Sequence, residues 1–467
     1  MNVLMVCAEF APWAKTGGLA DAVTGLSNAL AAGGHDVRVL LPGYAHLPGA
    51  GATLRPLPDG EGRYTELETG ARNGAAPRVY LLDLGTLTDP GVYTGDARDA
   101  GRFIMLASAA LELPAVLDWQ PDVLHCHDWH AALAPVLNGA AGGAGVAPSV
   151  LTLHNVGYQG VFASTVLEEY APPQLRPAIA PDALAGGDLN FLRAGVRAAD
   201  VVTTVSPTYA AEIRTPAFGM GLEDALSARG AGLVGILNGV DYDVWDPRSD
   251  PFLAAHYDAG DVGPKHDLKI ALAARSSLQV DASTPLIGVV TRLVPQKGID
   301  LLAALLPALL ADTRATFAIL GSGDALLAAT LAGFARDYPR RVAFTDGYDE
   351  ALAHLILAGS DLTLVPSRYE PCGLTQMYAL RYGTVPVVRA TGGLADTIAH
   401  FDPATGTGNG SVFRDADVGG LSWGLRTALD WFDDRAAWSH LVANAMAADF
   451  SWRNQAPHYE ALYRALL

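Results

Sequence analysis

The chain has 467 residues, which is too long for one hydrophobic core to grow efficiently, so its length predicts two domains or three. Its 49 acidic residues outnumber its 31 basic ones, and the formal net charge of -18 argues against nucleic acid or an anionic membrane as the main partner. The cysteines Cys7, Cys126 and Cys372 are odd in number and far apart, so they indicate neither a disulfide framework nor a clustered zinc site and favour a reducing cytoplasm.

The amino terminus and the longest apolar run predict a soluble protein. The opening residues MNVLMVCAEF lack the basic leader and small-residue cleavage site of a signal peptide, and they are typical of a first strand. The apolar run at 301–311 contains Pro307 and is followed by Asp312, so it falls well short of the roughly 20 apolar residues that a membrane span needs.

In the first half of the chain, short apolar runs alternate with longer amphipathic stretches. This pattern predicts βαβ units, and therefore a mainly parallel sheet covered by helices. The expected elements are a helix at 18–32 and strands at 3–6, 37–41, 79–84, 123–125, 150–153 and 201–205. The stretches 49–78 and 139–148 are rich in Gly, Ala and Pro, which predicts loops.

The pattern stops at residues 238–264, where the composition shifts to Asp, Gly and Pro. These are turn-forming residues, so this segment predicts a domain junction. Alternation then resumes, with expected strands at 286–291, 315–320, 341–344, 362–365 and 385–388. We therefore expect two α/β domains of similar size.

The hexapeptide TGGLAD occurs twice, at Thr16–Asp21 and at Thr391–Asp396. Each copy follows an expected strand and precedes an expected helix, where exposed backbone N–H groups can hold an anion. A lone glycine pair is a weak motif that also serves as a tight turn. Two identical copies in matching contexts favour a ligand contact from both domains.

Three cations lie next to strand ends. Lys15 precedes the first TGGLAD copy, while Arg292 and Lys297 follow an expected strand of the second half, with Gly298 opening a helix. Arg can hold a diphosphate bidentately and Lys supplies a compact charge, so these three residues predict a clamp for a leaving nucleoside diphosphate. The alternative for Arg292 and Lys297 is an ion pair with nearby acids.

The segment HCHDWH, residues 125–130, has the composition of a metal cluster. It lies at the end of an expected strand, its histidines alternate across the pleat, and the chain has no matching Cys/His pair, so its context argues against zinc. Asp128 is equally suited to accept a hydrogen bond from a sugar hydroxyl and to cap the next helix. His154 and Asn155 end another expected strand, and a structural or a functional role is equally open for His154.

The stretch 361–388 predicts a strand, a loop with Glu370, a helix behind Gly373 and a second strand. Glu370 suits an N-cap, a general base or a hydroxyl acceptor. Asn238 is a turn former before a glycine or a site residue, and Tyr348 either stacks on a base or packs. No G-x-G-x-x-G follows the first expected strand and no Walker A loop is present, which argues against dehydrogenases and P-loop kinases.

Several long segments resemble the bacterial glycogen synthase and plant starch synthase family, nearly end to end and in order. They are AEFAPWAKTGGLADAVTGL, PDVLHCHDWHAAL, LHNVGYQGVF, FLRAGVRAADVVTTVSPTYAAEI, GILNGVDYDVWDP, TRLVPQKGIDLL, SRYEPCGLTQMYALRYGTVPVVRATGGLADT and DFSW. The resemblance implies a GT-B fold, in which two Rossmann-like domains with parallel sheets face each other across a deep cleft. It implies an acceptor-side domain at 1–240 that forms part of the donor site, a donor domain at 241–450, and a final helix at 451–467 that crosses back to the first domain.

The implied reaction is retaining transfer of glucose from ADP-glucose to the 4-hydroxyl at the non-reducing end of an α-1,4-glucan such as glycogen, without metal or cofactor. In a front-face displacement the leaving phosphate helps to deprotonate the acceptor, unlike the paired carboxylates of a retaining glycosidase. The resemblance leaves the choice of ADP or UDP, the acceptor-binding residues and the oligomeric state open. Alternatives are a glucan phosphorylase, which needs a lysine-bound pyridoxal phosphate, and a non-catalytic glucan-binding protein.

Residue by residue, the resemblance implies a catalytic set and a donor-binding set. The implied catalytic residues are His154, Arg292, Lys297 and Glu370. The implied donor-binding residues are Lys15, Gly18, Asp21, Tyr93, Asp128, Asn238, Tyr348, Cys372, Gly373, Leu374 and Thr375. The chain departs from the family pattern at Gly186–Gly187, where an aromatic residue and a glycine are usual, and at Ala390, where an arginine is common.

Overall fold

The computed structural model describes residues 1–47, 54–56, 63–67, 76–142 and 145–467. The chain forms two compact units, of which the amino-terminal unit comprises Met1–Gly239 and Trp452–Leu467. The carboxyl-terminal unit comprises Val240–Ser451. Within the described ranges no helix is long and apolar enough to cross a membrane.

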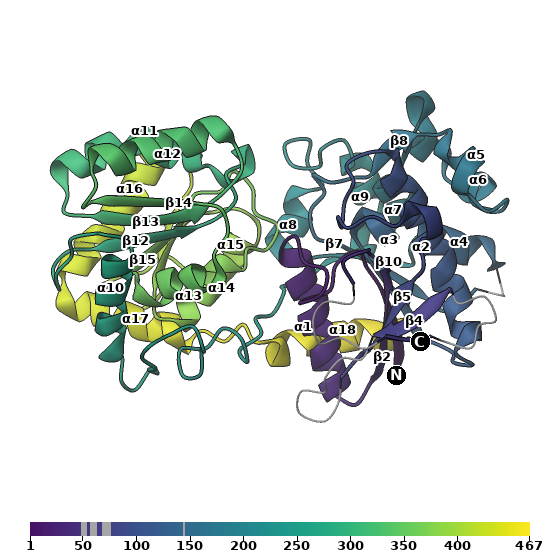
Figure 1. The fold of residues 1–467 in the computed structure, drawn as a ribbon, viewed down its shortest axis with the longest axis horizontal. Coiled ribbons are helices and arrows are strands. Elements are labelled where there is room, and N and C mark those ends of the chain that lie inside the picture. The colour runs from purple at the N-terminus through teal and green to yellow at the C-terminus, as the bar shows by residue number, and fades with distance from the viewer. Residues whose placement is uncertain (48–53, 57–62, 68–75, 143–144) are drawn as a thin grey trace. The chain divides into compact units, whose positions relative to one another are not determined.

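The amino-terminal unit is built on a nine-stranded sheet of order β11-β10-β7-β6-β1-β2-β5-β4-β3. Figure 1 labels some of these strands and the helices around them. Its parallel strands are β1 (Asn2–Val6), β2 (Asp36–Pro42), β5 (Arg78–Leu82), β6 (Val123–His127), β7 (Ser149–Leu153), β10 (Val201–Thr204) and β11 (Leu233–Gly235). They are short and almost wholly buried, because helices cover both faces of the sheet.

Two antiparallel strands, β3 (Leu54–Pro56) and β4 (Tyr64–Leu67), extend the sheet at its edge. They fall inside the stretch 49–78, so the prediction of a loop is wrong for these residues. Tyr64 and Leu67 are buried in β4, and pairing with β5 gives this short segment the partner that its composition does not reveal. The remainder of that stretch, apart from Arg63 and residues 76–78, lies outside the described residues.

A separate antiparallel ribbon joins β8 (Val161–Ala163) and β9 (Asp188–Asn190). The turn at Gly186–Gly187, whose φ angles are +69° and +88°, directly precedes β9. Only glycine adopts such angles without strain, which gives a local reason for glycine where the family commonly has an aromatic residue.

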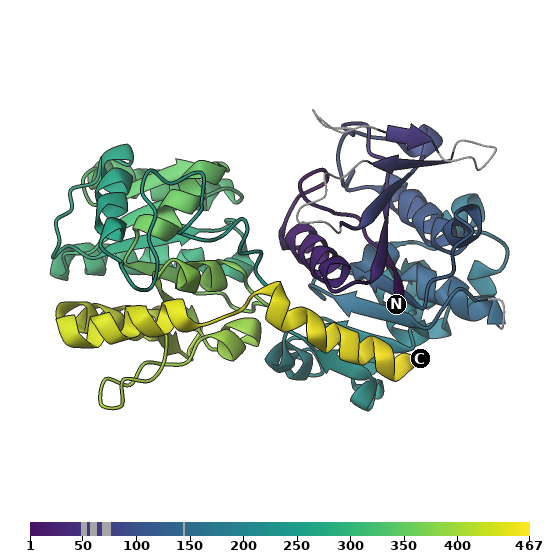
Figure 2. The same ribbon diagram turned by 90° about the horizontal axis from the view of Figure 1, so that it is seen from below.

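Helices cover the two faces of this sheet. On one face α1 (Gly18–Ala32) packs against α18 (Trp452–Leu466), the last helix of the chain (Figure 2). A Cβ atom at Gly25 of α1 would lie only 1.9 Å from Nε1 of Trp452, so this glycine permits the close approach. The other helices are α2 (Ala97–Val116), α3 (Asp128–Ala131), α4 (Leu133–Ala140), α5 (Val166–Tyr170), α6 (Leu175–Ala178), α7 (Phe191–Ala198), α8 (Pro207–Glu212) and α9 (Glu223–Ala228).

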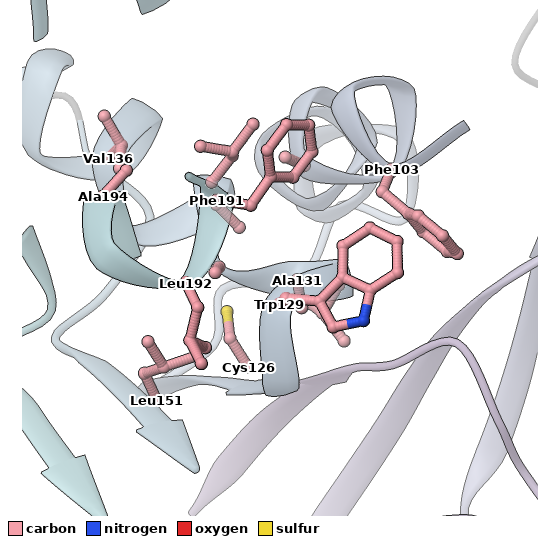
Figure 3. Packing of buried hydrophobic residues seen from close by; sticks show 14 of the residues in the cluster. Phe103, Cys126, Trp129, Ala131, Val136, Leu151, Phe191, Leu192 and Ala194 are labelled. Atoms are coloured by element: carbon pink, nitrogen blue, oxygen red, sulfur yellow. The ribbon is translucent and has the colours of Figure 1, made fainter. Parts of the chain in front are cut away.

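Trp129 anchors the short helix α3 in the apolar core on the opposite face (Figure 3). Phe103 packs edge-on against its indole at 4.9 Å between ring centroids, and Phe191 does so at 6.0 Å. Edge-to-face pairs of this kind add to the stabilisation from burial. Because Trp129 follows Asp128 directly, this packing fixes the point at which β6 ends and α3 begins.

The carboxyl-terminal unit has a six-stranded parallel sheet of order β14-β13-β12-β15-β16-β17. Its strands are β12 (Leu286–Val290), β13 (Thr316–Gly321), β14 (Val342–Asp346), β15 (Leu362–Val365), β16 (Val385–Arg389) and β17 (Ser411–Phe413). One helical layer contains α11 (Ile299–Asp312), α12 (Ala325–Asp337) and α16 (Val418–Asp433) (Figure 1). The other contains α10 (Pro264–Arg275), α13 (Glu350–Gly359), α14 (Thr375–Arg381) and α17 (Arg435–Ala447), and α15 (Gly392–Thr397) follows β16. The prediction of two Rossmann-like α/β domains with parallel sheets is confirmed.

Candidate active site

Glu9 organises the connection between β1 and α1. Its buried carboxylate accepts hydrogen bonds through Oε2 from the backbone N–H groups of Thr16 at 2.7 Å and Gly17 at 3.0 Å. Its Oε1 accepts a hydrogen bond of 2.5 Å from the hydroxyl of Tyr93. Glu9 therefore holds the first glycine pair and a predicted donor residue in place. Glu9 is not among the residues predicted from the sequence, although its place close behind a buried strand is the kind of signal that marks a site residue.

Lys15 and Asp21, both predicted to bind the donor, form an ion pair with 2.8 Å between Nζ and Oδ1. Their side chains are 36% and 30% exposed, so water screens the pair and it contributes little to stability. Lys15 can consequently exchange Asp21 for a stronger anion at small cost. Gly18, the first residue of α1, directly follows the loop that Glu9 holds.

Tyr93 lies between Glu9 and the aromatic core. Its ring stacks on His130 with 5.2 Å between centroids. Burial, followed by the neighbouring Glu9 carboxylate, raises the pKa of Tyr93 well above its ordinary value. The phenol is therefore a permanent hydrogen-bond donor to Glu9 at neutral pH.

Asp128 joins the ends of β6 and β7. It has a positive φ of +56°, and its Oδ1 accepts hydrogen bonds from the backbone N–H of His154 at 2.6 Å and of Asn155 at 3.4 Å. Burial raises the pKa of Asp128 to about 7, although both backbone hydrogen bonds favour the charged form. The helix-cap alternative is wrong for the described contacts, in which no side chain caps α3. Asp128 instead fixes the backbone at His154.

A line of histidines runs beneath this sheet edge. His154 Nε2 lies 3.1 Å from His127 Nδ1, and the His127 ring lies 4.2 Å from that of His125. His125 contacts the hydroxyls of Tyr463 at 2.7 Å and Thr152 at 2.6 Å. Burial lowers the pKa of His125 and of His154 to about 3, so both rings are neutral hydrogen-bonding groups at neutral pH. The alternation of these histidines is visible in the sequence, whereas the contact of His125 with α18 is not.

Among the residues that can be described, no group of three or more His, Cys, Asp and Glu side chains is arranged to hold a metal ion.

Asn238 is a further predicted site residue at the end of this unit. Its side chain is buried, and its Oδ1 has no hydrogen-bond partner within the described chain. Because a buried polar atom is normally satisfied, this oxygen is a candidate for a ligand contact.

In the carboxyl-terminal unit, Lys297 and Glu370 meet at the carboxyl ends of β12 and β15. Lys297 Nζ lies 2.6 Å from Glu370 Oε2, which also accepts a hydrogen bond of 2.7 Å from the Ser367 hydroxyl. The side chains of Lys297 and Glu370 are 18% and 7% exposed. The ion pair considered from the sequence is therefore present, and it joins two of the predicted catalytic residues.

Gly298 brings Lys297 to this position. Its φ is +65°, and a Cβ atom would lie 2.2 Å from the carbonyl oxygen of Pro366. Only glycine therefore lets the β12–α11 connection lie against the loop that follows β15. The conformation of the connection, and not the lysine side chain alone, positions the ammonium group.

A pocket surrounds the Lys297–Glu370 pair. It is lined by Val290, Thr291, Lys297, Leu364, Val365, Pro366, Ser367, Glu370, Gly373, Leu374, Thr375 and Gln376. The structure thus brings together five of the predicted residues at the carboxyl edge of the sheet, where ligands bind in open α/β folds. Gly373 has a φ of +73°, and a Cβ atom there would collide with Gln376 at 2.4 Å.

Three other predicted residues of this unit do not line the pocket. Arg292 follows β12 and is exposed, and Tyr348 follows β14 and is 69% exposed. Cys372 is buried, and its carbonyl oxygen accepts a hydrogen bond of 3.1 Å from Gln376. All three nevertheless lie beyond the carboxyl ends of strands in the same parallel sheet.

The second TGGLAD copy differs from the first. A Cβ atom at Gly392 would lie 1.9 Å from the carbonyl oxygen of Glu370, and one at Gly393 would lie 2.1 Å from that of Cys372. These glycines therefore allow close packing against the Glu370 loop. At Gly17 in the first copy, by contrast, a Cβ atom would meet nothing within 4 Å. The two copies share a sequence without sharing a packing role.

Comparisons with known proteins agree along the whole chain. A model of the starch synthase catalytic domain matches residues 2–228, and a model of group 1 glycosyl transferases matches residues 273–440. Glycogen synthase from Anaeromyxobacter dehalogenans (strain 2CP-1) is 45% identical, covering 100% of this chain and 99% of its own. Glycogen synthase from Serratia proteamaculans (strain 568) is 43% identical, covering 100% of both chains.

Solved structures give the same result. The catalytic domain of starch synthase IV from Arabidopsis thaliana, bound to ADP and acarbose, is 34% identical with a TM-score of 0.87, covering 99% of each chain. A sucrose-phosphate synthase from Thermosynechococcus elongatus, at 19% identity and a TM-score of 0.65, shares the fold. The chain therefore belongs to the glycogen synthase and starch synthase family of GT-B glycosyltransferases.

Proposed function

We propose that this chain is a glycogen synthase, which transfers glucose from ADP-glucose to the non-reducing-end 4-hydroxyl of an α-1,4-glucan with retention of configuration. The observation that carries the proposal is the Lys297–Glu370 pair in a pocket at the carboxyl edge of a parallel sheet. Full-length relatives named glycogen synthase, and the similar starch synthase bound to ADP and acarbose, support both the donor and the acceptor.

The donor diphosphate is assigned to the cations Lys15, Arg292 and Lys297. In an acidic chain these side chains supply local positive charge, and stabilising the departing diphosphate is the largest contribution expected from the protein. Backbone N–H groups at Gly18, Gly373, Leu374 and Thr375 are assigned to phosphate or sugar oxygens, and Tyr348 to the adenine ring.

The transferred glucose is assigned to His154, Asp128, Asn238 and Glu370. Asp128 holds the backbone of His154, and Asn238 offers a buried oxygen that is otherwise unsatisfied within the described chain. Tyr93, Asp21 and Cys372 are assigned to the surroundings of the donor. We assign no flanking carboxylate pair as acid and base, because the leaving phosphate itself takes the acceptor proton in a front-face displacement.

The proposal includes a cytoplasmic location, which is supported by three buried cysteines that form no disulfide.

The deciding experiment incubates the purified chain with glycogen and either ADP-glucose or UDP-glucose. We expect nucleotide release coupled to growth of the glucan, and release from neither donor contradicts the proposal. Glucose 1-phosphate formed from glycogen and phosphate would indicate a phosphorylase, and glycogen binding without product would indicate a non-catalytic glucan-binding protein.

A further inference from the structure

The guanidinium of Arg102 lies behind the loop that carries Tyr93. Arg102 belongs to α2, and its side chain is 0% exposed. Its Nε donates a hydrogen bond of 2.8 Å to the carbonyl of Leu87, and its Nη1 donates to the carbonyls of Gly91 at 3.2 Å and Val92 at 3.4 Å. Arginine presents several N–H donors in one rigid plane, so this single side chain binds the loop at two places.

Asp99 holds the same loop on the other side of Tyr93. Its carboxylate accepts hydrogen bonds from the backbone N–H of Thr94 at 3.0 Å and of Gly95 at 2.9 Å. Its Oδ1 also lies 3.4 Å from Arg102 Nη1, one turn further along α2. Carbonyl groups before Tyr93 thus bind Arg102, and N–H groups after Tyr93 bind Asp99.

The surroundings of Arg102 also reach the strand end that carries Glu9. The Arg102 guanidinium lies 5.8 Å from the centroid of the buried Tyr44 ring, within the range of a cation–π contact. The Tyr44 hydroxyl donates a hydrogen bond of 2.8 Å to the carbonyl of Ala8, which directly precedes Glu9. Arg102 therefore contacts the supports of both partners in the hydrogen bond between Tyr93 and Glu9.

The loop has no hydrophobic anchor of its own, since none of residues 85–96 is buried. Its conformation consequently depends on the buried polar groups behind it. These groups are a poor source of net stability, because Arg102 Nη2 has no hydrogen-bond partner within the described chain and a buried ion pair seldom stabilises more than apolar residues of equal volume. The benefit of burying Arg102 is better explained by the loop conformation that it imposes.

We propose that Arg102 is a positioning residue for the donor, which rests on the proposed function. Together with Asp99 it fixes the loop so that the Tyr93 hydroxyl meets Glu9 at 2.5 Å and the Tyr93 ring stacks on His130. The donor then meets a tyrosine that is already ordered, so its binding does not bear that loss of conformational entropy.

The test exchanges Arg102 for lysine, which keeps the charge but has no planar set of donors. With glycogen as acceptor, we expect Arg102→Lys to raise the donor KM about tenfold, the size of one lost hydrogen bond. The value of kcat should change less than about threefold and the acceptor KM less than about twofold. An unchanged donor KM would overturn the inference.

Arg341→Lys is the matched control in the carboxyl-terminal unit. The Arg341 guanidinium also donates to backbone carbonyls, of Thr313 at 2.9 Å and of Ala315 at 2.7 Å. Arg341 directly precedes β14, so it lies at the end of that sheet opposite the pocket. Its exchange should leave the donor KM unchanged, whatever its effect on the free energy of unfolding.

A double variant tests whether Arg102 acts through Tyr93. In a Tyr93→Ala background the loop has no tyrosine to position, so Arg102→Lys should change the donor KM less than about twofold. A tenfold rise in both backgrounds would contradict this route of action. A role of Arg102 in overall stability alone predicts the same effect with and without Tyr93.

A measurement without any ligand separates this inference from the proposed reaction. Amide hydrogen exchange of residues 87–95 reports the order of the loop in each protein. Faster exchange in Arg102→Lys than in Arg341→Lys and wild type supports the positioning of Tyr93 even if the wild-type chain transfers no glucose. Equal exchange in all three rejects it even if the chain is an active synthase. If Arg102→Lys does not fold, Asp99→Asn takes its place with the same expected results.

Discussion

Two buried carboxylates hold the polar groups of the candidate site. Glu9 accepts hydrogen bonds from the backbone of Thr16 and Gly17, and Glu370 pairs with Lys297. If a buried carboxylate loses its hydrogen-bonding or charged partners, the folded state is destabilised, because an unpaired charge inside a protein raises its free energy. Substitutions at these residues therefore change stability as well as chemistry, and experiments must separate the two effects.

Removal of the Lys297 side chain should lower turnover. We predict that Lys297→Ala lowers kcat about 100-fold or more, because the ammonium stabilises the departing diphosphate. The same change leaves the Glu370 carboxylate without its cation and lowers the free energy of unfolding by about 3 kcal/mol. The double variant Lys297→Met/Glu370→Gln should recover stability in denaturant titrations while its kcat stays low.

Arg314→Ala is the matched control, since this cation forms an exposed ion pair with Asp433. It should change neither kcat nor stability measurably. A stable double variant with normal turnover would remove Lys297 from the catalytic set.

Glu9 and Tyr93 should differ in their effects. We predict that Glu9→Ala lowers the free energy of unfolding by about 2 kcal/mol and raises the donor KM, because the backbone N–H groups of Thr16 and Gly17 lose their acceptor and the Tyr93 hydroxyl loses its partner. Tyr93→Phe removes one hydrogen bond and keeps both backbone contacts, so its effects should be smaller. Denaturant titration and donor saturation curves check this order, and a larger effect of Tyr93→Phe would contradict the role given to Glu9.

At the scale of elements, the site depends on the close approach of loops that follow adjacent strands. β12 pairs with β15, and the connection behind each strand carries one member of the Lys297–Glu370 pair. Gly298 makes that approach possible. The elements thus place the two side chains within hydrogen-bonding distance of each other.

Gly298→Ala should disturb this approach. We predict a loss of about 1–3 kcal/mol of stability, since the new methyl group collides with the Pro366 carbonyl and the positive φ is strained. A fall in kcat should accompany it as Lys297 shifts. The control is Gly333→Ala inside α12, where the nearest group is the flexible Arg336 side chain at 3.7 Å and alanine should be neutral or stabilising. Equal stability of the two variants would contradict the packing argument.

The helix α18 is attached to the first sheet through the contact between Tyr463 and His125. We predict that Tyr463→Phe lowers the free energy of unfolding by about 1–2 kcal/mol, because a buried ring nitrogen of His125 loses its partner. Urea denaturation followed by fluorescence measures the change. The exposed Tyr338→Phe variant should be unaffected, and an identical midpoint for both variants would show that the contact contributes no stability.

At the scale of the whole molecule, buried histidines make stability depend on pH. Burial lowers the pKa of His125 and of His130 to about 3, and it lowers that of His127 well below its ordinary value. Above pH 6.5 these rings are neutral in both states. Below it the unfolded chain gains protons that the folded chain does not bind, so stability is lost as the pH falls from about 6.5 towards 3.

The effect of Asp128 on the pH dependence of stability is opposite to that of the histidines. Its pKa is raised to about 7, so its contribution is fully present below its ordinary value and is lost as the pH rises through 7. We predict that the histidines dominate, with a net fall in the free energy of unfolding of up to about 3 kcal/mol per pH unit between pH 6 and 4. Denaturant titrations across this range provide the measurement. A stability that does not change with pH across this range would contradict the prediction.

Local patterns in the sequence determined the order of elements and the residues at strand ends. Most parallel strands of both sheets fall where short apolar runs predict them, because the periodicity of hydrophobic residues is a local property. The three-residue strands β11 and β17 are exceptions that the sequence did not predict. The short strands β3 and β4 did not follow from this pattern, because the pairing of β4 with β5 and of β3 with β4 supplies the stabilisation that their own residues lack. Lys297, Glu370, Gly373, Leu374 and Thr375, which the sequence predicts as site residues, line one pocket, and their functional roles stay a prediction.

Only the tertiary structure decided which of these residues are partners. Glu9 and Tyr93 are 84 positions apart and Lys297 and Glu370 are 73 apart, so neither pair is visible in any local pattern. The same holds for the two TGGLAD copies, which are identical in sequence but differ in what surrounds their glycines. A side chain's partner depends on the order of strands within the sheet, and that order forms only when distant segments pack together.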